Sequence, residues 1–380
     1  MPPVVLNTQN TDDVRDVVHR AVQALAEGKL VAIPTETVYG LAASALSADA
    51  VDRLSAVKGR KQNHPFTLAI KSADDALDFV PGLPLMARRL ARRCWPGPIT
   101  LVLDDSHPDS VLRQLPESVQ KAVAPSGTLG LRVPAHPLVL DVLRLLAGPI
   151  VLSSANRTGG PEAVTAAEVV AALGDDVQLV IDDGRSQFAQ PSTVVKVGPK
   201  KLEVLRAGVV SEATLKRLSS YMVVLVCTGN TCRSPMAEVL LRKRFADALK
   251  CTLDGLADAG VVVASAGVSA YPGGKAAVDA VHAMKERGLD LSCHVSQPLG
   301  ERLVNDADLI LTMTRGHREA VLQQFPGAAD RVELLATDRR DIADPLGGSP
   351  EDYLQCASQI DRYLAARLAE LDLARLVHGE

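Results

Sequence analysis

The chain contains few aromatic residues and few cysteines for its length. Phe, Trp and Tyr make up 3% of its 380 residues, so its cores must be built from Ala, Val and Leu. Six cysteines are too dilute for a disulfide framework, and no C-x-x-C pair supplies zinc ligands. No apolar run approaches the roughly 20 residues that span a bilayer, and the start of the sequence has no signal-peptide pattern. We therefore expect a cytoplasmic protein.

The charge of the chain is nearly balanced. It has 41 basic and 45 acidic side chains, which gives a formal net charge of −4 at pH 7. This composition provides no broad electrostatic attraction to nucleic acid or to anionic lipid. Any anion-binding site must therefore be local, and we expect neither a membrane partner nor strong direct binding to nucleic acid.

Short apolar runs alternate with helical patterns along the whole chain, which is typical of α/β layers. Thr165 and Glu168 form a capping box that predicts a helix start, and a long closing helix is predicted over residues 352–378. The length favours two domains. We place them at residues 1–211 and 222–380, with a linker at 212–221. Strand and helix alternation in the second domain predicts a doubly wound parallel sheet.

The segment after the apolar strand YMVVLV has the composition of a phosphate-binding loop. Backbone N–H groups and a helix N-terminus would converge there on one point. This positive field and Arg233 would lower the pKa of Cys227 and produce a thiolate nucleophile. Arg233 could also grip two phosphate oxygens through its planar fork. Gly229 and Asn230 tolerate the positive φ angles that such a cradle requires.

The sequence VCTGNTCRSPMAE closely resembles the low-molecular-weight protein tyrosine phosphatases. The similarity continues through SAG at 265–267, HVS at 294–296, ADLIL at 307–311 and ADP at 343–345, and it covers essentially the chain from residue 222 onward. It implies that Cys227 attacks phosphorus, that Ser234 eases departure of the sulfur, and that Asp344 protonates the leaving group and then activates water. Arg233 and the loop amides would hold the transferring group without a metal. The loop residues are Thr228, Gly229, Asn230, Thr231 and Cys232.

Two positions favour phosphoarginine over phosphotyrosine as the substrate. Thr231 occupies a position where the resemblance assigns a branched aliphatic residue to tyrosine phosphatases and Thr to protein arginine phosphatases. Its hydroxyl would hydrogen-bond or hold a water near the phosphorus, which favours attack on a P–N bond. Leu346 follows Asp-Pro where tyrosine-specific members carry an aromatic ring. Pro235 argues against the related arsenate reductases, which have Gln after Arg-Ser.

The first half has no Walker loop and no G-x-G-x-x-G motif, but basic residues stand at the ends of its predicted strands. Each of them alone is typical of a solvated surface charge. Together with PTETVYG at 34–40, WPGP at 95–98 and SSAN at 153–156, they resemble the YrdC-like threonylcarbamoyl-AMP synthase family. The resemblance spans about residues 12–211 and implies an α/β domain with a twisted mixed sheet and an open cavity.

Members of that family form L-threonylcarbamoyladenylate from L-threonine, bicarbonate and ATP for the t6A modification of tRNA. The resemblance assigns ATP to Lys58, Arg60, Thr128, Ser154, Asn156 and Arg206, and threonine to Thr35, Arg132 and Ser192. Fixed cations and hydroxyls suit attack on an α-phosphate that is crowded by negative oxygens. We expect Mg²⁺ to accompany ATP, with no ligand set assigned. The t6A transfer machinery is a candidate partner.

The sequence therefore predicts a bifunctional enzyme, and two alternatives stay open. The first is a phosphotyrosine phosphatase whose N-terminal half is a non-catalytic nucleotide- or RNA-binding regulatory module. The second is a relative of the carbamoyl-transfer enzymes that contain a YrdC-like domain, with carbamoyl phosphate as substrate. Release of pyrophosphate that requires threonine and bicarbonate would distinguish them. Cys232 either packs in the core or traps an oxidised Cys227 as a disulfide.

Overall fold

The computed structural model describes residues 2–11, 13–59, 64–198 and 201–378. The chain divides into two compact units, residues 1–215 (unit 1) and 216–380 (unit 2). Helix α8 (Glu212–Ser219) lies across this division and precedes the first strand of unit 2. In the described ranges, no helix has the length and apolar character that crossing a membrane would require.

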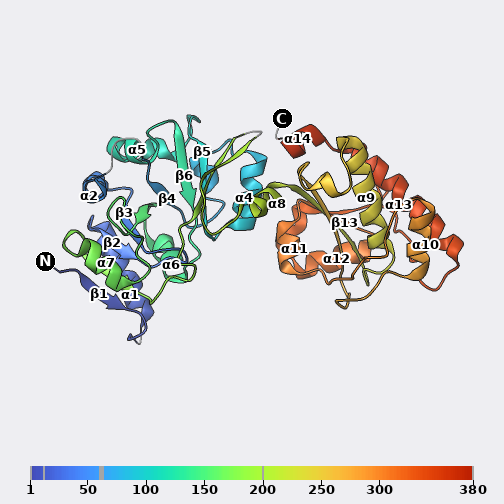
Figure 1. Cartoon of the computed structure of the whole chain (residues 1–380), viewed down its shortest axis with the longest axis horizontal. Helices are drawn as coiled ribbons and strands as arrows, with labels where there is room; N and C mark the ends of the chain where they lie inside the picture. The colour runs from blue at the N-terminus through green and yellow to red at the C-terminus, as the bar shows by residue number, and fades with distance from the viewer. Residues whose placement is uncertain (1, 12, 60–63, 199–200, 379–380) are drawn as a thin grey trace. The chain divides into compact units, whose positions relative to one another are not determined.

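Unit 1 is built on one large mixed sheet (Figure 1). In the part of the chain that the structure describes, ten strands follow the order β1-β8-β2-β3-β7-β4-β6-β5-β9-β10. The strands are β1 (Val4–Asn7), β2 (Val31–Ile33), β3 (Gly40–Ser44), β4 (Thr67–Ala69), β5 (Ile99–Asp104), β6 (Thr128–Arg132), β7 (Ile150–Ser154), β8 (Leu179–Asp182), β9 (Thr193–Val197) and β10 (Leu202–Arg206). The sheet contains parallel pairs, such as β4 with β6, and antiparallel pairs, such as β3 with β7, which confirms the expected mixed α/β sheet.

The helices of unit 1 pack apolar faces against this sheet. They are α1 (Val14–Ala26), α2 (Ala48–Lys58), α3 (Ala76–Phe79), α4 (Leu85–Cys94), α5 (Glu117–Val123), α6 (Pro137–Leu145) and α7 (Ala166–Leu173). The predicted capping box is present, because Thr165 and Glu168 cap α7 reciprocally. Helix α2 ends at Gly59, whose φ of 53° is left-handed. That stop leaves Lys58 as the last helical residue, buried beside the sheet.

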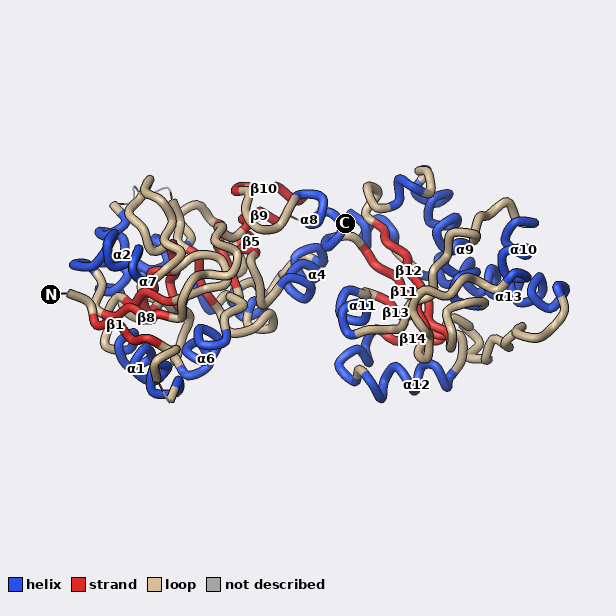
Figure 2. Tube along the Cα trace, turned by 60° about the horizontal axis from the view of Figure 1, so that its bottom comes forward, coloured by secondary structure: helices blue, strands red, loops and turns tan. Residues whose placement is uncertain are grey.

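Unit 2 has the predicted doubly wound parallel sheet, with strand order β12-β11-β13-β14 (Figure 2). Its strands are β11 (Tyr221–Cys227), β12 (Val261–Gly267), β13 (Leu309–Thr312) and β14 (Val332–Leu334). Its helices are α9 (Arg233–Leu249), α10 (Val278–Glu286), α11 (Glu301–Asp306), α12 (Arg315–Gln324), α13 (Pro350–Glu370) and α14 (Leu373–His378). Alternate residues of β11 pack against α9, α10 and α13 on one face and against α11 and α12 on the other.

The prediction of one closing helix over 352–378 was wrong. Helix α13 ends at Glu370 because Leu371 is extended, with φ −90° and ψ 126°. The Asp372 carboxylate then accepts the backbone N–H of Arg375 at 3.0 Å, which starts the short helix α14. Asp372, a residue type that commonly caps helices, therefore marks the point in the predicted helix where α13 has ended and α14 begins.

Candidate active sites

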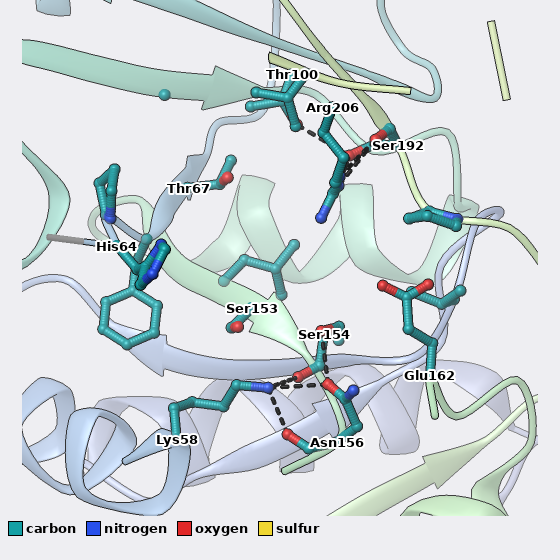
Figure 3. Close-up of a pocket in the computed structure, with 18 of the residues that line it drawn as sticks. Lys58, His64, Thr67, Thr100, Ser153, Ser154, Asn156, Glu162, Ser192 and Arg206 are labelled. Atoms are coloured by element: carbon teal, nitrogen blue, oxygen red, sulfur yellow. Dashed lines mark hydrogen bonds between the residues drawn. The ribbon is translucent and has the colours of Figure 1, made fainter. Parts of the chain in front are cut away.

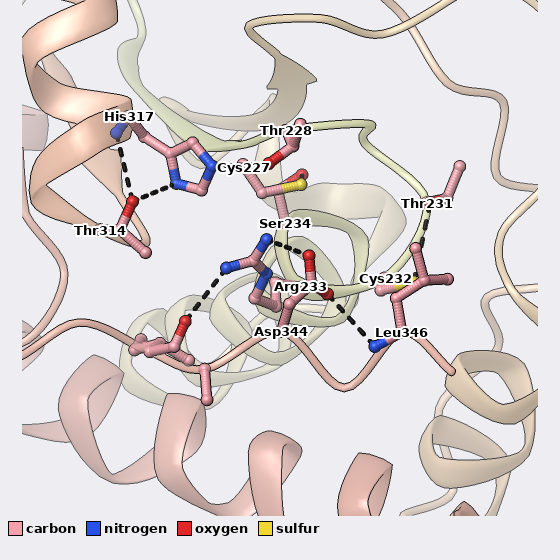
Figure 4. Close-up of polar contacts among 12 residues, drawn as sticks. Cys227, Thr228, Thr231, Cys232, Arg233, Ser234, Thr314, His317, Asp344 and Leu346 are labelled. Atoms are coloured by element: carbon pink, nitrogen blue, oxygen red, sulfur yellow. Dashed lines mark hydrogen bonds and ion pairs between the residues drawn. The ribbon is translucent and has the colours of Figure 1, made fainter. Parts of the chain in front are cut away.

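The phosphate loop, residues 228–232, joins the central strand of unit 2 to helix α9. Strand β11 is buried along its whole length and pairs in parallel with β12 and β13, so its carboxyl end lies where the strand order reverses. Cys227 is the last residue of that strand and is 3% exposed. Its Sγ lies 3.0 Å from the Ser234 hydroxyl oxygen and accepts the backbone N–H of Asn230 at 3.3 Å (Figure 4).

Asn230 organises the loop. Its φ is 55°, which is left-handed, whereas Gly229 has no positive φ, because Asn230 makes the left-handed turn by itself. The Asn230 side-chain amide donates to the hydroxyl oxygens of Ser234 and Ser265, each at 2.9 Å. Since an amide donor occupies the Ser234 oxygen, the Ser234 proton is left for two acceptors, the Cys227 sulfur at 3.0 Å and the Ala266 carbonyl at 3.3 Å.

The sequence reasoning missed the structural role of Gly267, the last residue of β12. A Cβ at this position would lie 2.3 Å from the Thr228 carbonyl oxygen and 2.9 Å from the Asn230 nitrogen. The loop can therefore rest on β12 only where no side chain intervenes. The signal was the SAG motif, whose glycine allows this close approach of two backbones.

Arg233 lies at the start of α9 with its guanidinium buried against the loop that carries Asp344. One terminal nitrogen donates to the Ile342 carbonyl at 3.0 Å, and the other forms an ion pair with the Asp344 carboxylate. The Arg233 Nε is buried and has no hydrogen-bond partner within the described residues. The Asp344 side chain is 42% exposed, so the carboxylate that pairs with the buried Arg233 guanidinium is accessible to solvent. The structure thus brings the predicted Cys227, Arg233, Ser234 and Asp344 to one end of the parallel sheet.

The remaining predicted loop positions lie around the same point. The Thr231 carbonyl accepts the backbone N–H of Ala277 at 2.9 Å, which ties the loop to the start of α10. Burial raises the pKa of the Cys232 thiol, which lies 3.7 Å from the Tyr353 hydroxyl. Leu346 is 69% exposed, directly after the Asp344 loop.

His317 on α12 is a neighbour of the loop that the sequence reasoning missed. Its Nε2 lies 2.8 Å from the Thr228 hydroxyl oxygen, and its Nδ1 lies 3.0 Å from the Thr314 hydroxyl oxygen. Burial, and then the charge of Arg233, lower the pKa of His317 to about 4. The imidazole is therefore neutral at physiological pH.

Unit 1 contains a cavity of about 780 Å³. Eight predicted site residues line it: Thr35, Lys58, Thr128, Arg132, Ser154, Asn156, Ser192 and Arg206. They come from helix α2, strands β6, β7 and β10, and the loops beside them (Figure 3). The predicted Arg60 lies outside the described residues.

Lys58 holds the S-x-N segment at the end of β7. Its Nζ donates to the Ser154 carbonyl and to the Asn156 side-chain oxygen, each at 2.9 Å, and also to the Asn156 carbonyl (Figure 3). The Ser154 hydroxyl donates to the same side-chain oxygen at 2.7 Å. The lysine and the two polar residues therefore form one cluster on the cavity wall, although 96 residues separate Lys58 from Ser154.

Arg132 is fixed by Glu36, whose role the sequence reasoning missed. The guanidinium donates to the Glu36 carboxylate at 2.7 Å and to the Thr37 hydroxyl at 2.9 Å. Glu36 also accepts the backbone N–H of Ala135 at 3.0 Å. The Arg132 Nε is buried with no hydrogen-bond partner in the described part of the chain. The acidic residue inside PTETVYG was the signal, since a buried cation beside a hydroxyl-rich loop needs a counter-charge.

Arg206 and Ser192 form another polar group on the cavity wall. Arg206 donates to the Ser192 carbonyl at 2.8 Å and to its hydroxyl oxygen at 3.0 Å. Burial lowers the pKa of Arg206, but a guanidinium stays protonated in proteins. Glu162 is the carboxylate-bearing residue among those that line this cavity. Within the described residues, no cluster of three or more His, Cys, Asp or Glu side chains is arranged to hold a metal ion.

Two family models match the chain. Residues 23–208 match the Sua5/YciO/YrdC family, described as telomere recombination, and residues 222–375 match the family described as low molecular weight phosphotyrosine protein phosphatase. A threonylcarbamoyl-AMP synthase from Pyrococcus abyssi is 36% identical over 48% of this chain and 52% of its own length. One from Chromohalobacter salexigens is 36% identical over 48% of this chain and 93% of its own length. The protein-arginine-phosphatase of Bacillus subtilis is 42% identical over 37% of this chain and 91% of its own length.

A solved structure agrees with the sequence relatives. Sua5 of P. abyssi in complex with L-threonine matches with a TM-score of 0.51 and 25% identity, covering 69% of this chain and 92% of that chain. This chain spans about half the length of the P. abyssi synthase that it matches. The chain belongs to two families, the Sua5/YrdC family through its first half and the low-molecular-weight phosphatase family through its second.

Proposed function

We propose that the chain is a bifunctional enzyme. Unit 1 forms L-threonylcarbamoyladenylate from L-threonine, bicarbonate and ATP, and unit 2 hydrolyses protein phosphoarginine through a cysteinyl-phosphate intermediate. The observation that carries the second activity is Cys227 at the start of the phosphate loop, with the Ser234 hydroxyl at 3.0 Å and an Arg233 Nε that has no partner among the described residues. The observation that carries the first is a cavity whose described lining includes the cations Lys58, Arg132 and Arg206 and several hydroxyls.

In the phosphatase step, the Cys227 sulfur attacks phosphorus as the bond from phosphorus to the leaving nitrogen breaks. The Arg233 Nε and the backbone N–H groups of the loop bind the phosphoryl oxygens, which carry the charge of the transition state. Asp344 gives its proton to the departing nitrogen and then takes a proton from the attacking water. That water breaks the S–P bond and releases inorganic phosphate, while the Ser234 hydroxyl donates to the departing thiolate.

Two features support phosphoarginine as the substrate. Leu346, exposed beside Asp344, has no ring to stack on a phenol, so it gives phosphotyrosine no aromatic partner. A relative named protein-arginine-phosphatase is 42% identical over 146 residues of this chain. We assign the Thr231 hydroxyl to the side of the loop that a guanidino nitrogen would approach.

In the synthase step, the cavity residues bind and orient rather than exchange protons. Lys58, fixed by Ser154 and Asn156, places a cation at the triphosphate, and Arg206 supplies a second from the opposite wall. Arg132 is held by Glu36, and its Nε, which has no partner within the described residues, would take the carboxylate of L-threonine. These fixed charges stabilise a crowded α-phosphate as a carbamate oxygen attacks and pyrophosphate leaves.

Mg²⁺ enters this proposal as part of the ATP substrate. Magnesium keeps several waters and binds mainly to substrate phosphates, so it does not need a cage of protein carboxylates. Glu162 on the cavity wall is the residue that we assign to its outer shell. We also propose a cytoplasmic location, since all six cysteines are free thiols, and the t6A transfer machinery as the recipient of the product.

The synthase proposal is tested by pyrophosphate release from ATP with the intact chain. Release must require both L-threonine and bicarbonate, and an adduct of threonine, CO₂ and AMP must appear. Release that carbamoyl phosphate supports in their place would instead indicate carbamoyl transfer. Nucleotide binding without release would leave unit 1 as a regulatory module.

The phosphatase proposal is tested by comparing matched peptides that carry phosphoarginine or phosphotyrosine at one position. We expect a higher kcat/KM for phosphoarginine, and Thr231→Val should lower that value more than the value for phosphotyrosine. Faster turnover of phosphotyrosine would overturn the assignment of substrate while leaving the cysteine mechanism intact.

A further inference from the structure

The contacts between helix α12 and the phosphate loop form a chain of three polar side chains. Thr314 caps the helix, since its hydroxyl oxygen accepts the backbone N–H of His317 at 3.2 Å. The same oxygen lies 3.0 Å from Nδ1 of His317, and Nε2 of that ring lies 2.8 Å from the Thr228 hydroxyl oxygen. His317 is 7% exposed, whereas Thr228 is exposed on the loop beside Cys227 (Figure 4).

The hydrogen-bond capacity of these groups favours one direction of the chain. The Thr314 oxygen already accepts one N–H, so its own proton is best placed on Nδ1 of the neutral ring. With Nδ1 as acceptor, the proton of the imidazole is on Nε2 and is donated to the Thr228 oxygen. Thr228 then accepts a hydrogen bond from His317, and its own hydroxyl proton can be donated to a different group.

We propose that His317 is a positioning residue that directs the Thr228 hydroxyl proton toward the phosphoryl group held over Cys227. Thr228 directly follows the nucleophile and is exposed, so its side chain lies on the solvent-accessible side of the loop. A hydroxyl that donates there supplements the backbone N–H groups, which cannot be reoriented. This inference rests on the proposed phosphatase function.

The neutral state of the His317 imidazole maintains the direction of these hydrogen bonds. The charged groups whose fields act on it are Arg233, which opposes protonation, and Asp344 and Asp341, which favour it. A neutral ring adds no positive charge to the site and donates through Nε2 alone, so the direction of the chain holds over the physiological pH range.

A four-variant cycle tests the proposal in the intact chain. Thr228→Val removes the hydroxyl at nearly constant shape, and His317→Met removes the ring donor at similar volume. Each change should lower kcat for the phosphatase about tenfold with little change in KM, the loss expected for one hydrogen bond to a charged transition state. The double variant should lose no more than the worse single variant, because both act through one hydroxyl.

Conservative variants distinguish a positioning role of His317 and Thr228 from a role in folding. His317→Gln keeps a donor near the place of Nε2 and should recover most of the loss of His317→Met, and Thr228→Ser should lose less than Thr228→Val. Additive losses, or a loss in His317→Met with none in Thr228→Val, would overturn the proposal in favour of a structural role. Inhibition by orthovanadate should weaken in Thr228→Val more than inhibition by inorganic phosphate.

A measurement without turnover distinguishes failure of this inference from failure of the proposed function. In ¹⁵N-histidine NMR spectra of the whole chain, with His317→Gln for assignment, His317 should carry its proton on Nε2 at neutral pH. A proton on Nδ1, or a doubly protonated ring at pH 6, would refute the chain even if the phosphatase were active. A wild-type chain with the Nε2 proton but no phosphatase activity would refute the proposed function instead.

Discussion

Replacing Glu36 with Ala should destabilise unit 1 far more than removing an equally close carboxylate on the surface. Glu36 and Arg132 are 4% and 6% exposed and meet at 2.7 Å. Glu36→Ala leaves a buried guanidinium without a counter-charge, and breaking a buried pair in this way costs about 3–5 kcal/mol. The matched control is Asp141, which pairs with Arg144 at 2.8 Å with side chains 53% and 60% exposed. Losing such an exposed pair costs about 0–1 kcal/mol.

Trp95 makes the assay specific for unit 1. It is the single tryptophan of the chain and is 7% exposed, so its fluorescence follows unfolding of that unit in urea. With a urea dependence of about 2 kcal/mol per molar, we expect Glu36→Ala to lower the unfolding midpoint by about 1.5–2.5 M. Asp141→Ala should lower it by less than about 0.5 M. Equal midpoints for the two variants would refute the account of how Arg132 is held.

Three further predictions concern unit 2. Its free energy of unfolding should fall by up to about 3 kcal/mol between pH 6.5 and pH 4, because His317 binds a proton in the unfolded chain but not in the folded one, where its pKa is lowered from 6.5 to about 4. Hydrogen exchange in β11 should show this fall, and His317→Gln should remove it. Gly267→Ala should destabilise the unit by about 1–3 kcal/mol and lower kcat, because its Cβ meets the Thr228 carbonyl at 2.3 Å, whereas Gly327→Ala, with no atom within 4 Å, should do neither. Asp344→Asn should lower kcat about 10²-fold or more for a phosphoarginine peptide and much less for para-nitrophenyl phosphate, whose leaving group needs little protonation; equal losses on both substrates would rule out a general acid.

Contiguous motifs were enough to predict that the candidate catalytic residues Cys227 and Arg233 lie together in unit 2. Cys227 and Arg233 lie in one strand-loop-helix segment, so local rules about helix N-termini and left-handed turns suffice to place them together. His317 could not be placed in this way, because it reaches the loop only through the pairing of β13 with β11. Gly267 is similar, since its requirement comes from a backbone that lies across from it on another strand.

Unit 1 is a harder case for sequence reasoning, since its site is assembled from distant strands. Lys58 meets Ser154 across 96 residues, and Arg132 meets Glu36 across the same separation. Composition and periodicity do not show which distant residues come into contact. Only the resemblance to a family suggested that these residues form one site. Glu36 was overlooked because an acid in a loop is usually solvated, whereas here a buried arginine fixes it.

The most direct test of two independent active sites uses the intact chain with Cys227→Ser and Lys58→Ala, each assayed for phosphoarginine hydrolysis and for threonine-dependent release of pyrophosphate. The account predicts that Cys227→Ser abolishes the first activity and spares the second, and that Lys58→Ala does the reverse. Loss of both activities from either substitution, or phosphatase activity that persists without the Cys227 sulfur, would contradict it.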